Sequence, residues 1–350
     1  MTARPHIRSP DAGTGARVSR RLFLAAACGL AAGACTAQLP GTPRAASATE
    51  VPQPAAAISS STALSTAAPT SAAKPSPAPR RHVAIPQNVV GGYWPLWQTD
   101  GPSLRDVPPE YNVIYVFSAM PSGAPGEMVL RPFGNADQTV TGFAEDVAHC
   151  RTVQGRSVLL SLGGAQAGVG FTSRSVSTAF VDSVRRVVDS LGGVDGVDLN
   201  TFEGDQVPDV REYSWISGKL KDVYGPQFAV VCPPAPWRDT DKVFCKQMVA
   251  AGMLDLCGPQ FYDGVGLATV DSITGGIAEW VDLVGAEHLC VGFGVGASGD
   301  YMTAEQCAAA WKAVVGRYPA LRGANLWSLP ADHSAGWRFA TLVGRSIASR

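Results

Sequence analysis

A repeated alternation of strand-like and helix-like segments constrains the fold of this chain more than any other feature. From the third apolar run onward, successive runs begin 27 to 37 residues apart. A strand followed by a helix at this spacing predicts βα units and a parallel sheet. Eight units in about 260 residues predict an α/β fold, a single-domain (β/α)8 (TIM) barrel. The predicted strands begin near Val89, Asn112, Ser157, Val194, Gln227, Leu254, His288 and Gly323.

The segments between the strands have helical periodicity. Apolar residues from Phe180 to Leu191 share one helical face, and so do those from Ala304 to Tyr318. Thr303 and Gln306 have the spacing of a capping box. The alternative is an open doubly wound sheet with a glycine-rich nucleotide turn. Because Gly91-Gly92 is followed by Tyr-Trp-Pro, which does not open such a helix, the barrel is favoured.

The first 85 residues differ from the rest in charge and composition. They carry nine basic and two acidic side chains, against 19 basic and 27 acidic in the remainder. Residues 1–35 hold Arg20-Arg21 before a short apolar run, which resembles a twin-arginine (Tat-type) signal peptide. Residues 36–85, rich in Ala, Ser, Thr and Pro, predict a disordered linker. The barrel is predicted to span residues 86–350 of an exported, extracellular or cell-surface protein.

Cys35 leaves two alternatives open. It follows Ala32-Gly33-Ala34, which is similar to a lipobox except that alanine stands where leucine is usual. Lipid attachment at Cys35 would anchor the protein to a membrane. Simple cleavage near Ala37 would release it.

Composition and spacing argue against several classes of partner. The net charge of −1 argues against nucleic acid, and no metal-binding Cys or His spacing occurs. We therefore expect no cofactor and no metal, and a monomer. The six cysteines beyond the leader allow disulfides in an exported protein, but their apolar surroundings fit buried free thiols equally well.

Aromatic residues gather where the predicted strands end. Catalytic and binding residues of a (β/α)8 barrel lie at this end of the strands, and flat rings suit the faces of sugars. Many of these rings would also fit the core, but Tyr262 and Trp327 stand beside polar residues and favour a cleft. The set is Tyr93, Trp94, Trp97, Phe117, Phe202, Tyr262 and Trp327.

Four strand-end motifs, in order, resemble family 18 glycoside hydrolases, the chitinase and endo-N-acetylglucosaminidase family. Ser161-Leu-Gly-Gly is similar to the family's S-x-G-G element, and Asp195-Gly-Val-Asp198 to the start of its D-G-x-D-x-D-x-E signature. Gln260-Phe-Tyr-Asp263 resembles its Q-x-Y element, and Gly323 to Ser328 its G-x-x-x-W-S element. The resemblance covers roughly residues 87–348 and implies the barrel fold.

The resemblance implies a chitinase-like hydrolase that cleaves N-acetylglucosamine-containing polysaccharides with retention. The substrate's own N-acetyl group would be the nucleophile, so this family departs from the two-carboxylate scheme. Asp195, Asp198 and Asn200 occupy the three acidic positions of the signature before the acid, and Tyr262 that of the tyrosine that binds the acetamido group. Together, the strand-end aromatic residues and the family motifs predict the substrate-binding residues Tyr93, Trp97, Phe117, Gly163, Gly164, Gln260, Asp263 and Trp327.

The signature departs from the family at its most important position. Phe202 stands where the acid belongs, and Glu203 comes one residue later. Because side chains alternate along a strand, Asp198, Asn200 and Phe202 are expected on one face and Glu203 on the other, unless the strand bulges or has ended. Either Glu203 is a displaced catalytic acid, or the barrel is inactive and binds glycan or serves as a cell-envelope interaction protein.

Overall fold

Eight parallel strands close into a barrel, as the repeat predicts. The computed structural model describes residues 82–165, 167–202 and 206–350. Glu203, the predicted leader (1–35) and most of the predicted linker lie outside the described residues. The barrel strands are β1 (Val89–Pro95), β2 (Val113–Pro121), β4 (Ser157–Gly163), β5 (Gly196–Asn200), β6 (Ala229–Cys232), β7 (Leu256–Cys257), β8 (Cys290–Gly294) and β9 (Gly323–Trp327). Each begins within two residues of its predicted start.

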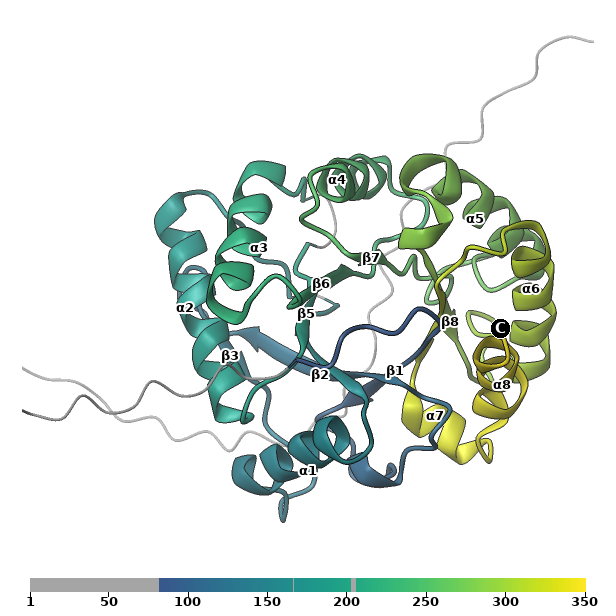
Figure 1. Cartoon of the computed structure of the whole chain (residues 1–350), viewed down its shortest axis with the longest axis horizontal. Coiled ribbons are helices and arrows are strands. Elements are labelled where there is room, and N and C mark those ends of the chain that lie inside the picture. The colour runs from purple at the N-terminus through teal and green to yellow at the C-terminus, as the bar shows by residue number, and fades with distance from the viewer. Residues whose placement is uncertain (1–81, 166, 203–205) are drawn as a thin grey trace, which may run out of the picture. The chain divides into compact units, whose positions relative to one another are not determined.

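The strands pair in the order β7-β6-β5-β4-β2-β1-β9-β8. Parallel bridges from Cys257 to Leu289 and from Gln260 to Gly292 join the two ends of this order. A short strand, β3 (Met128–Leu130), pairs antiparallel with the end of β2 and extends the sheet beyond the barrel. The barrel is therefore closed, with one added hairpin at its carboxyl end (Figure 1).

Helices surround the barrel and cover its outer face (Figure 1). The segment between β1 and β2 forms a 3-10 turn, η1 (Leu104–Asp106), in place of an α-helix. The chain ends in α7 (Leu329–Ser334), the π-helical η3 (Ala340–Gly344) and α8 (Arg345–Ala348). The other helices are α1 (Val140–Thr152), α2 (Arg174–Ser190), α3 (Val210–Tyr224), α4 (Asp239–Ala250), α5 (Val270–Val284), η2 (Ala286–His288) and α6 (Ala304–Arg317).

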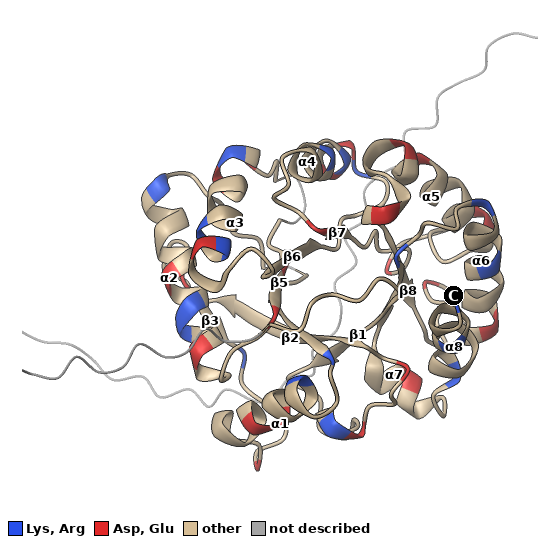
Figure 2. Cartoon of the chain, in the orientation of Figure 1, with Lys and Arg blue, Asp and Glu red and all other residues tan. Residues whose placement is uncertain are grey.

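Local sequence explains where these helices begin and which face they bury. Thr303 caps α6 in a complete capping box with Gln306, as predicted. The predicted apolar face of α2 is buried against the sheet, with Phe180, Val184 and Val188 fully covered. Charged residues lie mainly on the helices outside the barrel (Figure 2). The amphipathic pattern thus places each helix with its apolar side inward.

Side-chain alternation divides the core into two layers. On β2, Val113, Tyr115 and Phe117 point into the barrel, whereas Ile114 and Val116 pack against the helices. The same alternation along β9 puts Asn325 and Trp327 inside. The inner layer holds apolar side chains toward the amino-terminal ends of the strands. It holds polar and aromatic side chains toward their carboxyl-terminal ends.

Buried cysteines belong to this core and are free thiols. Cys150, Cys232, Cys245, Cys257, Cys290 and Cys307 are all buried and unpaired by disulfides. The free-thiol alternative of the sequence analysis therefore holds. Among the described residues, no helix is long and apolar enough to cross a membrane.

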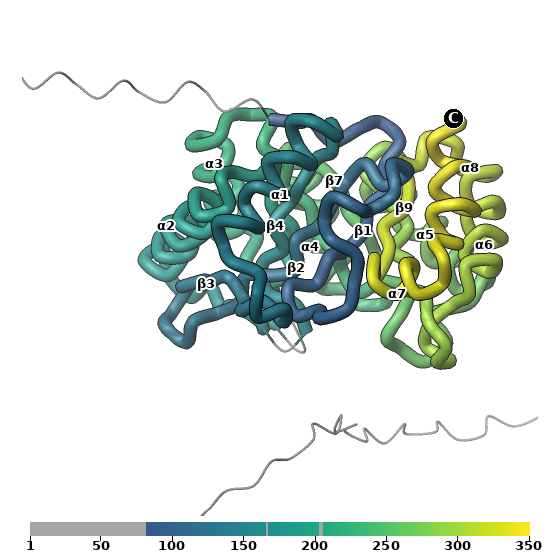
Figure 3. Tube along the Cα trace, turned by 90° about the horizontal axis from the view of Figure 1, so that it is seen from below, coloured from purple at the N-terminus to yellow at the C-terminus, as the bar shows by residue number. Residues whose placement is uncertain are grey.

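Asp195 anchors the amino-terminal end of the barrel. Its fully buried carboxylate accepts hydrogen bonds from Arg151 at 2.8 and 3.0 Å and from the Val158 backbone at 2.9 Å. The Val83 backbone donates to the same carboxylate at 2.8 Å. Residues 82–85, placed in the linker by composition, thus contact the barrel. The first described residues and the carboxyl terminus lie at this same end (Figure 3).

We predict that Asp195→Ala lowers the free energy of unfolding by about 3 kcal/mol, because it removes the carboxylate partner of the largely buried Arg151 guanidinium. Urea unfolding of the purified protein measures this loss. The control is Asp222→Ala, which breaks an exposed pair with Lys219 and should cost less than about 1 kcal/mol. Equal losses in the two variants would contradict the anchoring role.

Candidate active site

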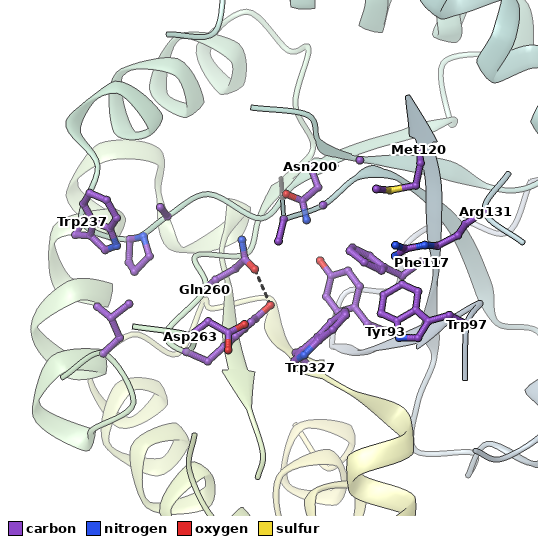
Figure 4. A pocket seen from close by; sticks show the side chains of 17 residues that line it. Tyr93, Trp97, Phe117, Met120, Arg131, Asn200, Trp237, Gln260, Asp263 and Trp327 are labelled. Atoms are coloured by element: carbon purple, nitrogen blue, oxygen red, sulfur yellow. Dashed lines mark hydrogen bonds between the residues drawn. The ribbon is translucent and has the colours of Figure 1, made fainter. Parts of the chain in front are cut away.

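A cavity of about 460 Å³ opens at the carboxyl ends of the strands. Ten of the predicted site residues line it, so the sequence motifs converge in space as expected. Figure 4 shows the cavity with several of these side chains. The ten are Tyr93, Trp97, Phe117, Gly163, Gly164, Asn200, Gln260, Tyr262, Asp263 and Trp327.

Aromatic rings form one wall of the cavity. The Trp327 ring lies 5.0 Å from that of Phe117 and 5.7 Å from that of Tyr93, measured between centroids. Trp97 follows β1 and packs edge-on against Phe117 at 5.5 Å. The peptide bond after Phe117, within β2, and the one after Trp327, the last residue of β9, are both cis. Four rings from three neighbouring strands and the residues that follow them thus present a continuous apolar surface.

Two glycines let β4 approach this wall. Gly163 has a φ of 89°, and a Cβ atom there would lie 2.2 Å from the Asn200 carbonyl oxygen. Gly164 has a φ of 125°, and its Cβ would lie 2.5 Å from the Phe117 ring. Both positions therefore require glycine, for conformation and for space. The S-x-G-G motif serves the shape of the cavity.

Polar groups face the aromatic wall. The Tyr262 hydroxyl donates to Gln260 Oε1 at 2.8 Å, and Gln260 Nε2 donates to the Pro233 carbonyl at 2.6 Å. Asp263 has a φ of 55° and accepts a hydrogen bond from the Tyr301 hydroxyl. Asn200 ends β5 between these groups and the aromatic wall. The cavity thus offers amide and hydroxyl groups opposite flat rings.

Asp198 lies inside the barrel on β5, two residues before Asn200. Its side chain is buried, and Ser161 on β4 donates a hydrogen bond to it at 2.5 Å. Burial raises the pKa of Asp198 to about 7, against the opposing effects of the Ser161 and Tyr93 hydroxyls. The carboxyl group is therefore largely protonated below neutral pH.

Asp195, the first acidic residue of the signature, lies before the amino-terminal end of β5. The cavity is at the carboxyl end of the same strand. Its carboxylate is engaged with Arg151 and two backbone amides. The structure thus places Asp195 away from the cavity, in a supporting position.

The Phe202 side chain does not follow the alternation of side chains that the sequence predicts for this strand. The sequence predicts that it shares the face of Asp198 and Asn200, but β5 ends at Asn200. The Phe202 ring packs against Tyr213 of α3 and Phe244 of α4, with centroids 6.0 and 5.1 Å away. The preceding Thr201 also contacts Tyr213, through a 2.6 Å hydrogen bond between hydroxyls. Two successive side chains thus face the helices because the strand has ended.

The sequence analysis did not identify several residues that line the cavity. Two of them stand out, Trp237 because it is exposed and Arg131 because it is charged. Trp237 is 64% exposed and follows β6, so the rule that functional residues follow strand ends could have found it. Its segment is fixed by Asp241, which accepts from the Ala235 backbone at 2.9 Å. Arg131 follows β3, a strand outside the repeat, and carries no sequence signal. Among the described residues, no group of three side chains could hold a metal ion.

Known proteins resemble this chain in sequence over part of their length. No family model matches the chain. Chitinase Chi52 of Paenibacillus xylanexedens is 33% identical over 112 residues, 31% of this chain and 20% of that protein. A chitinase of Enterococcus faecalis is 27% identical over 217 residues, 56% of this chain and 57% of that protein. The chain is similar in sequence to these chitinases. It spans from a fifth to somewhat over half of the length of these curated relatives.

Solved structures share the fold. A family GH18 chitinase from Chromobacterium violaceum has a TM-score of 0.66 at 22% identity, over 76% of this chain and 85% of that one. A xylanase and α-amylase inhibitor protein, XAIP-I, solved with trehalose, has a TM-score of 0.60 at 19% identity, over 73% and 97%. At these identities the structures establish the (β/α)8 barrel, and the sequence relatives carry the similarity to chitinases.

The buried Asp198 predicts a pH dependence of stability. Its pKa is raised in the folded protein above the usual value near 4, so the folded state binds the extra proton. Stability from this group is present at acid pH and is lost as the pH rises from about 4 to 7. In Asp198→Asn this loss should be absent, a difference of about 3 kcal/mol over that range.

Urea unfolding of both proteins at several pH values measures the difference. The matched control is Asp182→Asn, an exposed carboxylate on α2, which should leave the pH profile unchanged. Parallel profiles for the wild type and Asp198→Asn would show that Asp198 is ionised in the folded protein.

Proposed function

We propose that the protein binds N-acetylglucosamine-containing glycans in the cavity at the carboxyl ends of its strands and hydrolyses them with retention. The observation that carries the proposal is the cavity itself, in which the rings of Trp327, Phe117 and Trp97 face the polar groups of Asn200, Gln260 and Tyr262. An N-acetylated sugar has the matching surfaces, with apolar C–H faces and an amide that both donates and accepts. The similarity to chitinases supports the same substrate class.

The acetamido group of the substrate is the proposed nucleophile. Its carbonyl oxygen attacks the anomeric carbon as the bond to the leaving oxygen breaks, and water later restores the sugar with net retention. Asn200 offers its amide oxygen to the acetamido N–H, but without the negative charge of an aspartate. The Tyr262 hydroxyl donates to Gln260, so a substrate carbonyl competes with Gln260 for this proton.

Glu203 is the proposed acid that protonates the leaving oxygen. The support for this role is that side chains stop alternating between the two faces of the strand just before Glu203. Asn200 lines the cavity, whereas Thr201 and Phe202 both contact Tyr213 on the helix side. Two successive residues on one side are what a bulge or a strand end produces, and such irregularities at barrel rims re-aim the next side chain.

A second candidate function is glycan binding without hydrolysis. It is favoured by one observation, that the residue at the acid's position, Phe202, is packed between α3 and α4. A protein that inhibits xylanase and α-amylase shares the barrel, so the fold by itself does not determine the activity. We further propose that residues 1–35 direct export to the cell surface or medium, with Cys35 as the candidate lipid anchor.

We predict that Glu203→Gln lowers the rate of hydrolysis of N-acetylglucosamine tetramers by about 1,000-fold, because it removes the proton donor. Mass spectrometry of the products measures the rate, and calorimetry shows that the variant still binds the tetramer. The matched control is Asp205→Asn, which removes a neighbouring carboxylate and should retain activity within about threefold. If the wild type binds the tetramer but never cleaves it, the binding alternative replaces hydrolysis.

We predict that Trp327→Ala weakens binding of the tetramer by about tenfold or more, because it removes a large apolar surface from the cavity. Calorimetry measures the dissociation constant. Trp215→Ala is the control, since Trp215 lies on α3 outside the cavity lining, under the Arg174 guanidinium. A larger effect at Trp215 than at Trp327 would place the glycan elsewhere.

A further inference from the structure

Arg131 brings a positive charge into the cavity. It follows β3, and its half-buried side chain lines the cavity beside Trp97. The guanidinium carbon lies 4.4 Å from the centroid of the Trp97 ring. Among the described residues, no acidic side chain forms an ion pair with it. A cation of this kind at a binding surface is open to an anionic ligand.

The stacking on Trp97 leaves the guanidinium ready for such a ligand. When a guanidinium lies against an aromatic ring, the face of the guanidinium interacts with the face of the ring through a cation–π attraction. Its N–H groups lie in the plane of the guanidinium and are still available as donors. Two of them match the two oxygens of a carboxylate, so the fixed orientation favours a bidentate hydrogen bond.

The charges of the cavity lining are separated. Among the residues that the structure describes, the other charged lining residue is Asp263, which lies beside Gln260, across the Trp327 ring from Arg131 (Figure 4). Its carboxylate is engaged by the Tyr301 hydroxyl. Asn200, between the two, is neutral, and Asp198 beneath is largely protonated below neutral pH. Arg131 therefore sets the charge at its end of the cavity.

We propose that the Arg131 end of the cavity binds a sugar that carries a carboxylate, so that the glycan is an acidic one in which N-acetylglucosamine alternates with a carboxylate-bearing residue. The proposal rests on the proposed function only in that the cavity binds an N-acetylated glycan. Two sources share this chemistry. The carboxylate stands on a lactyl ether in muramic acid and on the ring in a hexuronic acid. Hydrogen bonds from Arg131 to a carboxylate should favour the acidic glycan about tenfold over a neutral one.

Calorimetry on the purified full chain tests the proposal, because it measures binding without requiring cleavage. Three tetrasaccharides are compared: the neutral N-acetylglucosamine tetramer, an alternating N-acetylglucosamine–N-acetylmuramic acid tetramer, and an alternating N-acetylglucosamine–glucuronic acid tetramer. A fourth probe is the muramic acid tetramer with its carboxyl groups converted to methylamides, which keeps the shape and removes the charge. We expect one acidic tetramer to bind about tenfold more tightly than the neutral tetramer, and the methylamide to lose this advantage.

Variants assign the preference to Arg131. In Arg131→Gln, the ratio of acidic to neutral affinity should fall to about one, and in Arg131→Lys to an intermediate value, since lysine keeps the charge but not the planar pair of donors. The matched control is Arg317→Gln on α6, which removes a guanidinium stacked on Tyr318 outside the cavity and should leave the ratio unchanged.

The outcomes are distinguishable. If the neutral tetramer binds at least as tightly as both acidic ones, the carboxylate site is wrong while the proposed function stands. The same holds if the preference survives Arg131→Gln, since the charge then acts elsewhere. If no tetramer binds, both the carboxylate site and the proposed function fail. The muramic acid and glucuronic acid tetramers together identify which source of the carboxylate fits.

Discussion

The hydrogen bond between Ser161 and Asp198 is the contact on which the candidate site depends. It joins β4 to β5 inside the barrel at 2.5 Å, directly beneath the residues that line the cavity. Through the paired register of these strands, it fixes Gly163 opposite Asn200. Because the Asp198 carboxyl group is buried and largely protonated, this contact costs no buried charge below neutral pH. The floor of the cavity is thereby hydrogen-bonded from strand to strand and is largely uncharged below neutral pH.

The charged groups at the two ends of the barrel are held in different ways. At the amino-terminal end, Asp195 and Arg151 form a fully engaged ion pair that holds the start of β5 and the incoming chain at Val83. At the carboxyl end, the Arg131 guanidinium lacks an ionic partner among the described residues. This division matches the general rule that one end of such a barrel serves stability and the other function.

The sequence was sufficient for the barrel and for most of the cavity because both depend on periodic patterns. Strand starts and the buried face of α2 follow from alternation and from helical periodicity, which one sequence displays directly. The end of β5 could not be predicted in this way, since whether Phe202 continues the alternation depends on Tyr213 and Phe244, which arrive from later helices. Arg131 was missed for a similar reason, because β3 lies outside the repeat.

The substitution of asparagine at position 200 changes how an acid in this cavity can be kept protonated. An aspartate there would raise the pKa of a nearby carboxylic acid by like-charge repulsion. Asn200 is neutral, and Asp198 is itself largely protonated below neutral pH, so neither supplies that repulsion. The Arg131 guanidinium would act in the opposite direction. If Glu203 is the acid, as proposed, desolvation by a bound glycan is one way to keep it protonated, and proton donation is then coupled to occupancy of the aromatic wall.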